Sequence, residues 1–311
     1  MRGWLPTDPA QLRRFAAGAS LTLAALLAVL KLAAALATGS LAVLSSLIDS
    51  LADIVASAIT FVSVQISQQP PDRGHRFGHG KAESLSALVQ AALVAGSAVF
   101  VLIDAVRRLG DPRPIGATWL GVLVMTFAIV ATLLLVWFQR HVVRETGSQA
   151  INADSVHYRA DLLTNLSIIA SLLLTQRLGW LWLDPLIGGV IALYLGWHAY
   201  GIGGDAVRVL MDHELPAETR QRIKDIVLAH AEVQGLHDLR TRESGSTQFI
   251  ELHVEIDGAM TVSSAHEVTD AIEAELFAAF PAAEVILHQE PAGLDDARLD
   301  HRINRTATTA A

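Results

Sequence analysis

The sequence contains no cysteine, and only 17% of its residues are charged. Without cysteine the protein forms neither disulfides nor thiolate metal sites, so a metal would have to be held by nitrogen and oxygen ligands. No glycine-rich loop followed by Lys-Ser or Lys-Thr occurs, which leaves no predicted site for ATP phosphates. No nucleophile and base stand in a pattern that suggests catalysis. The sequence therefore does not predict an enzyme.

Apolar residues make up 52% of the 311 positions, and the mean hydropathy is +0.41. They occur in blocks, each long enough for the about 20 residues that cross a bilayer core. Because lipid accepts only spans whose backbone hydrogen bonds close internally, the blocks predict a membrane α-helical domain. The first block is too long for a secretory signal and is expected to be retained. Six spans are predicted, at 13–37, 41–66, 84–106, 117–138, 150–175 and 180–203.

After residue 208 the sequence becomes mixed and strongly acidic. Residues 209–311 hold 8 Lys+Arg and 19 Asp+Glu, a net charge of −11, which disfavours nucleic acid as a partner and suits cations. Amphipathic and alternating segments predict a small α/β domain of order αββαβ. The expected organisation is a six-helix transmembrane domain at 1–208, a metal-binding soluble domain at 209–292 and a disordered tail at 293–311.

Basic residues are distributed unevenly around the predicted spans. Eight Arg and Lys residues fall in short segments on the side of the N-terminus, and four fall on the other side. Cytoplasmic segments carry the excess of Lys and Arg in membrane proteins. Both termini, and with them the soluble domain, are therefore predicted to lie in the cytoplasm.

Two pairs of metal-ligand side chains lie inside predicted spans. Asp49 and Asp53 in LIDSLADIV are four residues apart and share one helix face, and His157 and Asp161 in SVHYRADLLTN repeat this spacing. Ionisable groups inside a span are costly and mark a functional path. Three carboxylates and one imidazole suit Zn²⁺ or a related cation. Alternatively, each acid is neutral and hydrogen-bonded to a neighbouring helix. Asp154, one turn before His157, is expected at a cap or mouth.

Two further groups of residues are candidate metal ligands. Asp72, His75 and His79 in PDRGHRFGHGK lie on a glycine-rich loop, for which a weak metal site and a plain solvated loop are both open interpretations. In the acidic domain, several histidines fall on predicted strands or near a helix start, some with acids beside them. The candidates there are His237, His253, His266, His288 and Glu290.

The chain resembles the cation diffusion facilitators, in particular their bacterial zinc/iron efflux type. The resemblance rests on SLIDSLADI, PDRGHRFGHGKAESL, ADSVHYRADLLTN, HDLRTRESG and VILHQEP, and it runs from about residue 12 to 292. It implies a multi-pass homodimer of the bacterial inner membrane, a metallochaperone-like cytoplasmic dimerisation domain and exchange of metal for protons by alternating access. It assigns the transport site to Asp49, Asp53, His157 and Asp161.

The resemblance also implies a secondary metal site on the loop residues and two zinc ions in the cytoplasmic domain, near the dimer interface. The last acid of that domain site is commonly Asp in the family, whereas this chain has Glu290. The additional methylene group can alter a geometry in which one carboxylate bridges two ions.

The sequence thus predicts a secondary active exporter of Zn²⁺, with Cd²⁺ or Fe²⁺ as further substrates and regulatory Zn²⁺ in the cytoplasmic domain. Protons compete with metal for the same ligand atoms, and His157 is the group best suited to exchange a proton near neutral pH. The alternatives are a membrane metal sensor with a structural intramembrane site and a passive channel. No kinase or DNA-binding signature follows the domain, and channels use weak, multiple sites.

Overall fold

The computed structural model describes residues 6–38, 41–110, 119–178, 182–294, 298–301 and 303. The chain separates into two compact units, Met1–Leu210 and Met211–Ala311. Their boundary lies two residues beyond the expected end of the transmembrane domain. Each unit is described by itself below.

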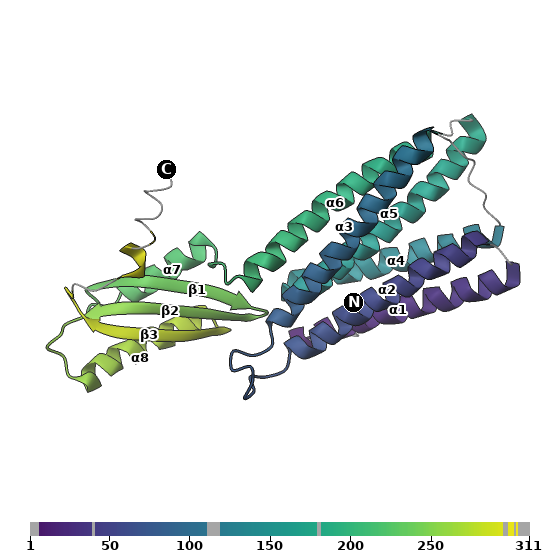
Figure 1. Cartoon of the computed structure of the whole chain (residues 1–311). Coiled ribbons are helices and arrows are strands. Elements are labelled where there is room, and N and C mark those ends of the chain that lie inside the picture. Colours follow the sequence, from purple (N-terminus) through teal and green to yellow (C-terminus); the bar gives the residue numbers. More distant parts are fainter. Residues whose placement is uncertain are drawn as a thin grey trace. The chain divides into compact units, whose positions relative to one another are not determined.

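Long helices form the whole of the first unit. The described residues contain α1 (Pro9–Thr38), α2 (Leu41–Ser67), α3 (Lys81–Gly110), α4 (Trp119–Thr146), α5 (Gln149–Leu178) and α6 (Leu183–Leu210). These six helices confirm the predicted helical membrane domain, and most extend a few residues beyond the predicted spans (Figure 1). Residues 117–118 and 180–181 of those spans lie outside the described residues.

Within this described part, five helices are long and apolar enough to cross a membrane: α1, α2, α3, α4 and α6. Helix α5 is not among them, although it has 30 residues. Its first half carries Asp154, Arg159 and Asp161, so the predicted span at 150–175 is apolar only in its second half. Such a helix is compatible with a membrane when its neighbours cover its polar face, and α5 contacts α2, α3, α4 and α6.

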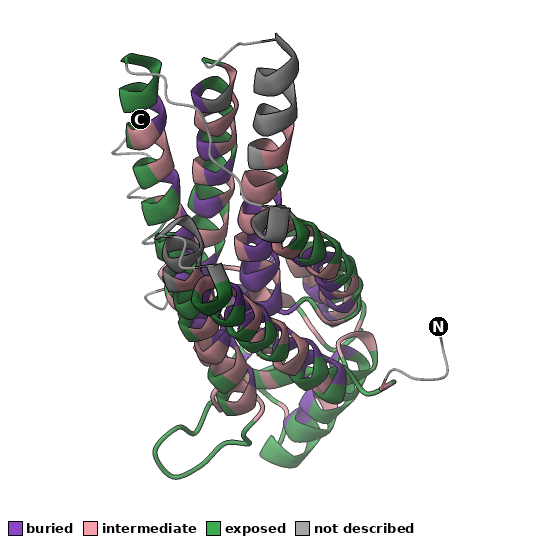
Figure 2. Ribbon diagram, turned by 90° about the vertical axis from the view of Figure 1, so that its right-hand side faces the viewer, coloured by how far each residue is buried: buried purple, intermediate pink, exposed green. Residues whose placement is uncertain are grey.

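Small side chains allow the membrane helices to pack closely. Ala16, Ala56, Ala87 and Ala150 are fully buried or nearly so, and buried residues line the helix faces that point toward one another (Figure 2). In lipid, where hydrophobic burial gives little drive, close backbone approach supplies the packing energy. Large apolar side chains such as Trp197 lie on the outer faces and are exposed, as expected of a surface that contacts lipid.

The second unit is a small α/β domain. Its elements are α7 (Ala217–Leu228), β1 (Gly235–Ser244), β2 (Thr247–Ile256), α8 (Val262–Ala279) and β3 (Ala283–Pro291), which confirms the predicted order αββαβ. The strands form one sheet in the order β1-β2-β3, in which β1 is antiparallel and β3 parallel to β2. The core lies between this sheet and the two helices.

The alternation of side chains along β2 decides which face of the sheet carries the histidines. Leu252 and Val254 are buried in the core with residues of α7 and α8. His253 lies between them and therefore points to the opposite face. The strand register places His253 beside His237 of β1 and His288 of β3. Three histidines thus form one row across the sheet.

The expected disordered tail differs from the structure over a short stretch. Residues 299–301 are helical, and the backbone N–H groups of Leu299 and Asp300 donate to the carboxylate of Asp238 at 2.7 and 2.9 Å. Burial raises the pKa of Asp238, but these two donors, together with the nearby His237 and His253, lower it more, so that it lies below its ordinary value. Residues 295–297, 302 and 304–311 of the expected tail lie outside the described residues.

Candidate metal centres

Three of the four predicted intramembrane ligands come together between α2 and α5. His157 Nε2 lies 3.1 Å from Oδ1 of Asp53 and 3.9 Å from Oδ2 of Asp161. Two ligands that are each about 2 Å from one tetrahedral ion lie roughly 3.3 Å apart. The group therefore needs only small side-chain adjustments to hold one divalent ion, and its ligand atoms all lie within 4.8 Å of one another.

Asp49, the fourth predicted ligand, does not join this group. It lies one turn before Asp53 on α2 and is exposed, whereas Asp53 is partly buried. Four residues of helix correspond to about 6 Å, so the Asp49 carboxylate has to turn along the helix face to reach the same ion. Its ligation remains a prediction.

Asp154 is expected from the sequence at a cap or a mouth. The structure instead places it fully buried inside the helix bundle. Gln139 of α4 donates from Nε2 to Oδ2 of Asp154 at 2.7 Å and to Ser20 Oγ of α1 at 2.9 Å. Close by, Tyr158 donates to the Ser20 carbonyl at 2.9 Å and contacts Ser57 Oγ of α2 at 2.8 Å. These contacts join four helices beside the ion-site residues. The sequence gives no signal for these contacts, because Ser20 and Ser57 are isolated hydroxyls in largely apolar runs and Gln139 stands beside the ordinary flanking residues Arg140 and His141.

The structure brings the three predicted loop residues together. His75 Nδ1 lies 3.5 Å from Oδ1 of Asp72, and His79 Nε2 lies 3.3 Å from Oδ2. The backbone N–H groups of His75 and Gly74 donate to Asp72 Oδ1, and they lower the pKa of Asp72 below its ordinary value. An ionised carboxylate is the form that binds metal. This group, of which Asp72 and His75 are exposed, is the second place where three candidate ligands converge.

The third group lies on the sheet of the second unit and consists of His237, His253 and Glu290. Nδ1 of His237 lies 3.1 Å from Oε1 of Glu255, and its Nε2 lies 3.5 Å from Oε2 of Glu290. Glu290 also forms a hydrogen bond with Nδ1 of His253. With Nδ1 of His237 donating to Glu255, Nε2 is the ring nitrogen left to face a metal, and Glu255 fixes the ring orientation.

The last two predicted ligands of this domain differ in their placement. His288 is exposed but adjacent to the group, because its Nε2 lies 3.4 Å from Oε1 of Glu290 and its ring centroid lies 4.7 Å from that of His253. His266, in the first turns of α8, is exposed and contacts Asp270 of its own helix. A single chain therefore gathers four of the five predicted ligands, and the role of His266 remains a prediction.

We expect Glu290→Gln to weaken Zn²⁺ binding at the sheet. Glu290 contacts all three histidines of the row, and the amide both removes a charge and offers only one oxygen. Loss of a supporting residue around a metal costs about 10–100-fold in affinity, so loss of this ligand should cost at least that. Titration of the purified full-length protein with Zn²⁺ in competition with a chelating dye measures the effect. The control is Glu284→Gln, an exposed acid on the same face of β3; equal loss in both variants would contradict the assignment.

Comparisons with known proteins match the two units separately. Residues 18–211 match the cation efflux transmembrane domain, and residues 215–292 match the cytoplasmic domain of cation efflux proteins. The cation-efflux pump FieF of Shewanella oneidensis is 44% identical over 278 residues, which cover 89% of this chain and 94% of that protein. The FieF pump of Escherichia fergusonii is 43% identical over 276 residues, which cover 89% and 92%.

Among solved structures, the chain is similar to the metal-bound C-terminal domain of the CzcD transporter from Thermotoga maritima. The sequence identity is 32%, the match covers 26% of this chain and 100% of that domain, and the TM-score is 0.24.

A bundle of membrane helices that encloses acids and a histidine, followed in the chain by a small α/β domain, defines the class as a helical membrane protein with a separate α/β domain. Within that class, the chain belongs to the cation efflux family, the cation diffusion facilitators. The family resemblance inferred from the sequence motifs is thereby confirmed.

Proposed function

We propose that the chain exports divalent cations from the cytoplasm across the bacterial inner membrane, with Zn²⁺ as the main substrate and Cd²⁺ or Fe²⁺ as further ones. The group of Asp53, His157 and Asp161 between two membrane helices carries this proposal. Two carboxylates and one imidazole suit these borderline cations better than Mg²⁺ or Ca²⁺, which prefer oxygen alone. Asp49 is the proposed fourth ligand. Relatives named as cation-efflux pumps support export as the direction.

Proton exchange follows from the chemistry of the proposed ligands. Metal binds the ionised carboxylates and the neutral imidazole, so protons and metal compete for the same atoms. A site that opens in turn to the two sides of the membrane takes up metal where protons are scarce and releases it where they are abundant. The inward proton gradient then drives metal outward. No nucleotide is required, and the chain is proposed to act as a secondary active transporter.

The cytoplasmic domain is proposed to regulate this exchange. The regulatory zinc would be held by His237, His253, His288 and Glu290. The positive charge of the ion would draw these four side chains together. We also propose that this domain joins two chains into a homodimer and that both chain termini lie in the cytoplasm. The match of residues 215–292 to the cytoplasmic domain of cation efflux proteins supports this arrangement.

Flux measurements in proteoliposomes test the proposed exchange. We expect a Zn²⁺ gradient alone to drive protons in the opposite direction, recorded by a pH dye inside the vesicles, and a pH step alone to drive Zn²⁺. An ionophore that collapses the pH difference should abolish the second flux. Zn²⁺ flux that persists without any proton movement would indicate a channel, and a complete lack of flux in folded protein would indicate a sensor.

A further inference from the structure

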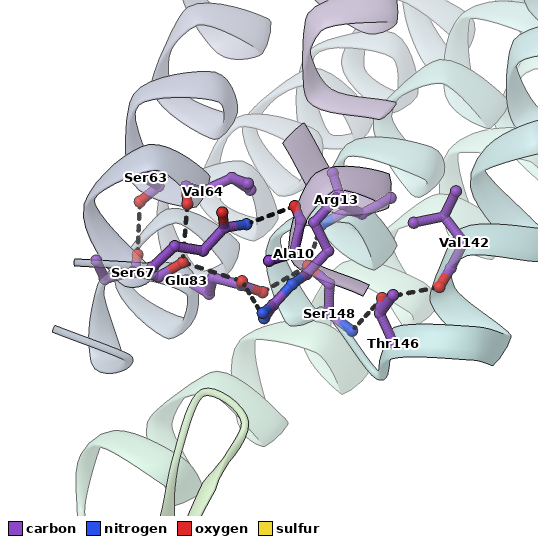
Figure 3. A network of polar contacts seen from close by, with 12 residues as sticks. Ala10, Arg13, Ser63, Val64, Ser67, Glu83, Val142, Thr146 and Ser148 are labelled. Carbon is purple, nitrogen blue, oxygen red and sulfur yellow. Dashed lines mark hydrogen bonds and ion pairs between the residues drawn. The ribbon is translucent and has the colours of Figure 1, made fainter. Parts of the chain in front are cut away.

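A buried charge pair lies at the end of the membrane unit that carries the loop between α2 and α3. Arg13 of α1 and Glu83 of α3 are only 8% and 2% exposed, and Arg13 Nη1 donates to Glu83 Oε1 at 3.0 Å. The same oxygen accepts from Ser67 Oγ of α2 at 3.1 Å, and Oε2 accepts at 2.5 Å from Ser148 Oγ, which stands directly before α5 and accepts from the backbone N–H of Ile151 in its first turn. One carboxylate thus joins four helices (Figure 3). These four residues are called the Arg13–Glu83 network below.

A buried ion pair adds little net stability, because desolvation of the two charges offsets most of their attraction. Such a pair is favourable when additional donors satisfy the remaining lone pairs of the carboxylate, as Ser67 and Ser148 do for Glu83. Glu83 has its three donors only while the ends of α1, α2 and α5 meet at the N-terminal end of α3. Separation of α1 leaves a buried charge without its partner, and separation of α2 or α5 removes a hydroxyl donor from the buried carboxylate. The network therefore favours two discrete arrangements, closed or fully opened to water.

A row of polar side chains on α2 runs from the ion-site residues toward this network. From Asp53, Ser57 and Thr60 follow at steps of four and three residues, which is the spacing of one helix face. Both are fully buried. Ser57 contacts the Tyr158 hydroxyl of α5 at 2.8 Å, and Thr60 Oγ1 accepts from Gln90 Nε2 of α3 at 3.0 Å. Val64, one turn beyond Thr60, is also fully buried, so packed side chains lie along α2 between the ion-site residues and Ser67.

Exposure increases in the opposite direction along the same two helices. The side chain of Asp161 is 35% exposed, against 12% for His157 one turn earlier on α5. On α2, Asp49 is exposed and Asp53 is partly buried. Asp49 and Asp161 are each the member of their pair that lies farther from the Arg13–Glu83 network. Of the proposed ligands, the two that lie farther from the network, Asp49 and Asp161, are thus more exposed than their partners Asp53 and His157.

We propose that the Arg13–Glu83 network is a latch that closes the cytoplasmic route to the ion site and has to open before the site loads. This inference rests on the proposed function, since loading from the cytoplasm presupposes export. Ser67 is fourteen residues from Asp53, which corresponds to about 21 Å of helix, so the latch residues do not bind the ion. They position the helix ends and set the balance between the two access states.

The lack of native cysteine allows a direct test by thiol labelling. Thr60→Cys places one reporter on the buried row between the site and the latch. Inverted membrane vesicles present the cytoplasmic face to a membrane-impermeant maleimide. With the latch closed, labelling should be slow. Introducing Glu83→Gln into the Thr60→Cys protein should raise the labelling rate of the introduced thiol by about tenfold or more. The reason is that Arg13 then loses its charged partner while it is buried.

Two further variants separate a latch from a general structural role. Ser148→Ala removes one donor without stranding a charge and should give a smaller, few-fold rise in labelling. The swap Arg13→Glu with Glu83→Arg restores an ion pair and should return labelling toward the parent rate. Asp104→Asn breaks the exposed Asp104–Arg108 pair near the other end of α3 and should change nothing. Zn²⁺ binding to the detergent-solubilised protein should be the same in all of them, since the ion ligands are untouched.

The outcomes distinguish failure of the latch from failure of the proposed function. If the parent exchanges Zn²⁺ for protons but Glu83→Gln labels at the parent rate, the latch proposal is wrong. If labelling rises equally in Asp104→Asn, the effect is general loosening and the proposal is also wrong. If the parent shows no Zn²⁺ flux at all, the proposed function fails, whatever the labelling rates.

Discussion

Asp53→Ala is expected to abolish Zn²⁺ transport in proteoliposomes. Asp53 lies 3.1 Å from His157 Nε2 and is the only α2 acid that the structure places in the intramembrane group. The substitution removes a charged ligand and leaves the imidazole and Asp161 on one helix alone. Loss of a residue that only supports a metal ligand lowers metal affinity or activity by about 10–100-fold. Loss of the ligand itself should therefore lower the Zn²⁺ flux by at least about 100-fold.

The appropriate control removes an acid from the same unit without touching the site. Asp104→Asn neutralises an exposed acid of α3 whose partner is Arg108, and its Zn²⁺ flux should stay close to that of the parent. Both variants should elute as folded protein in size-exclusion chromatography. Near-normal Zn²⁺ flux in folded Asp53→Ala protein would refute the intramembrane site, and with it the proposed route of transport.

The polar pairs inside apolar runs were sufficient to predict three members of the intramembrane group. A spacing of four residues puts Asp53 near Asp49, and His157 near Asp161, on a single helix face whatever the tertiary fold. Whether the two faces meet depends on how α2 and α5 pack. The structure shows that they do for three residues, and it leaves Asp49 outside the group. Local periodicity identified the candidates, and helix packing decided which of them converge.

The buried polar contacts between helices could not be predicted in this way. Arg13 resembles an ordinary flanking residue that favours a cytoplasmic N-terminus, and Glu83 resembles a first-turn acid that stabilises a helix start. Only the fold brings them within 3.0 Å of each other. The same holds for Asp154, whose partner Gln139 belongs to another helix. Each residue has an adequate local explanation, so the sequence gives no indication of its partner on another helix.

The sheet of the cytoplasmic domain was predictable in more detail. Alternation along β2 indicates that His253 lies opposite to the core, whereas the parallel pairing of β3 that brings His288 beside it is seen only in the structure. The close approach of Glu290 to the histidine row is less evident from sequence, because it depends on the register of β3. The longer Glu side chain reaches both His237 and His253 in this register. The departure from the Asp that is common in the family is therefore compatible with ligation by this chain.

His157→Asp is expected to change which metal is transported. The substitution converts a mixed set of two carboxylates and one imidazole into carboxylates alone. Oxygen-only sets favour hard cations such as Mn²⁺, whereas imidazole favours Zn²⁺. We expect Zn²⁺ flux to fall by about 10–100-fold or more and Mn²⁺ flux to appear or to rise. Parallel proteoliposome assays with Zn²⁺, Cd²⁺, Fe²⁺ and Mn²⁺ measure the ratio of rates.

The ratio of the Zn²⁺ and Mn²⁺ rates separates a ligand from a residue that only supports the fold. A structural defect lowers all fluxes together and leaves their ratio unchanged, whereas the exchange of a ligand changes the ratio itself. His141→Asp, an exposed histidine of α4, is the matched control and should keep the parent's preference. If His157→Asp also keeps that preference while it still transports Zn²⁺, the imidazole does not contact the ion. The intramembrane group would then consist of a carboxylate site beside a histidine with another role.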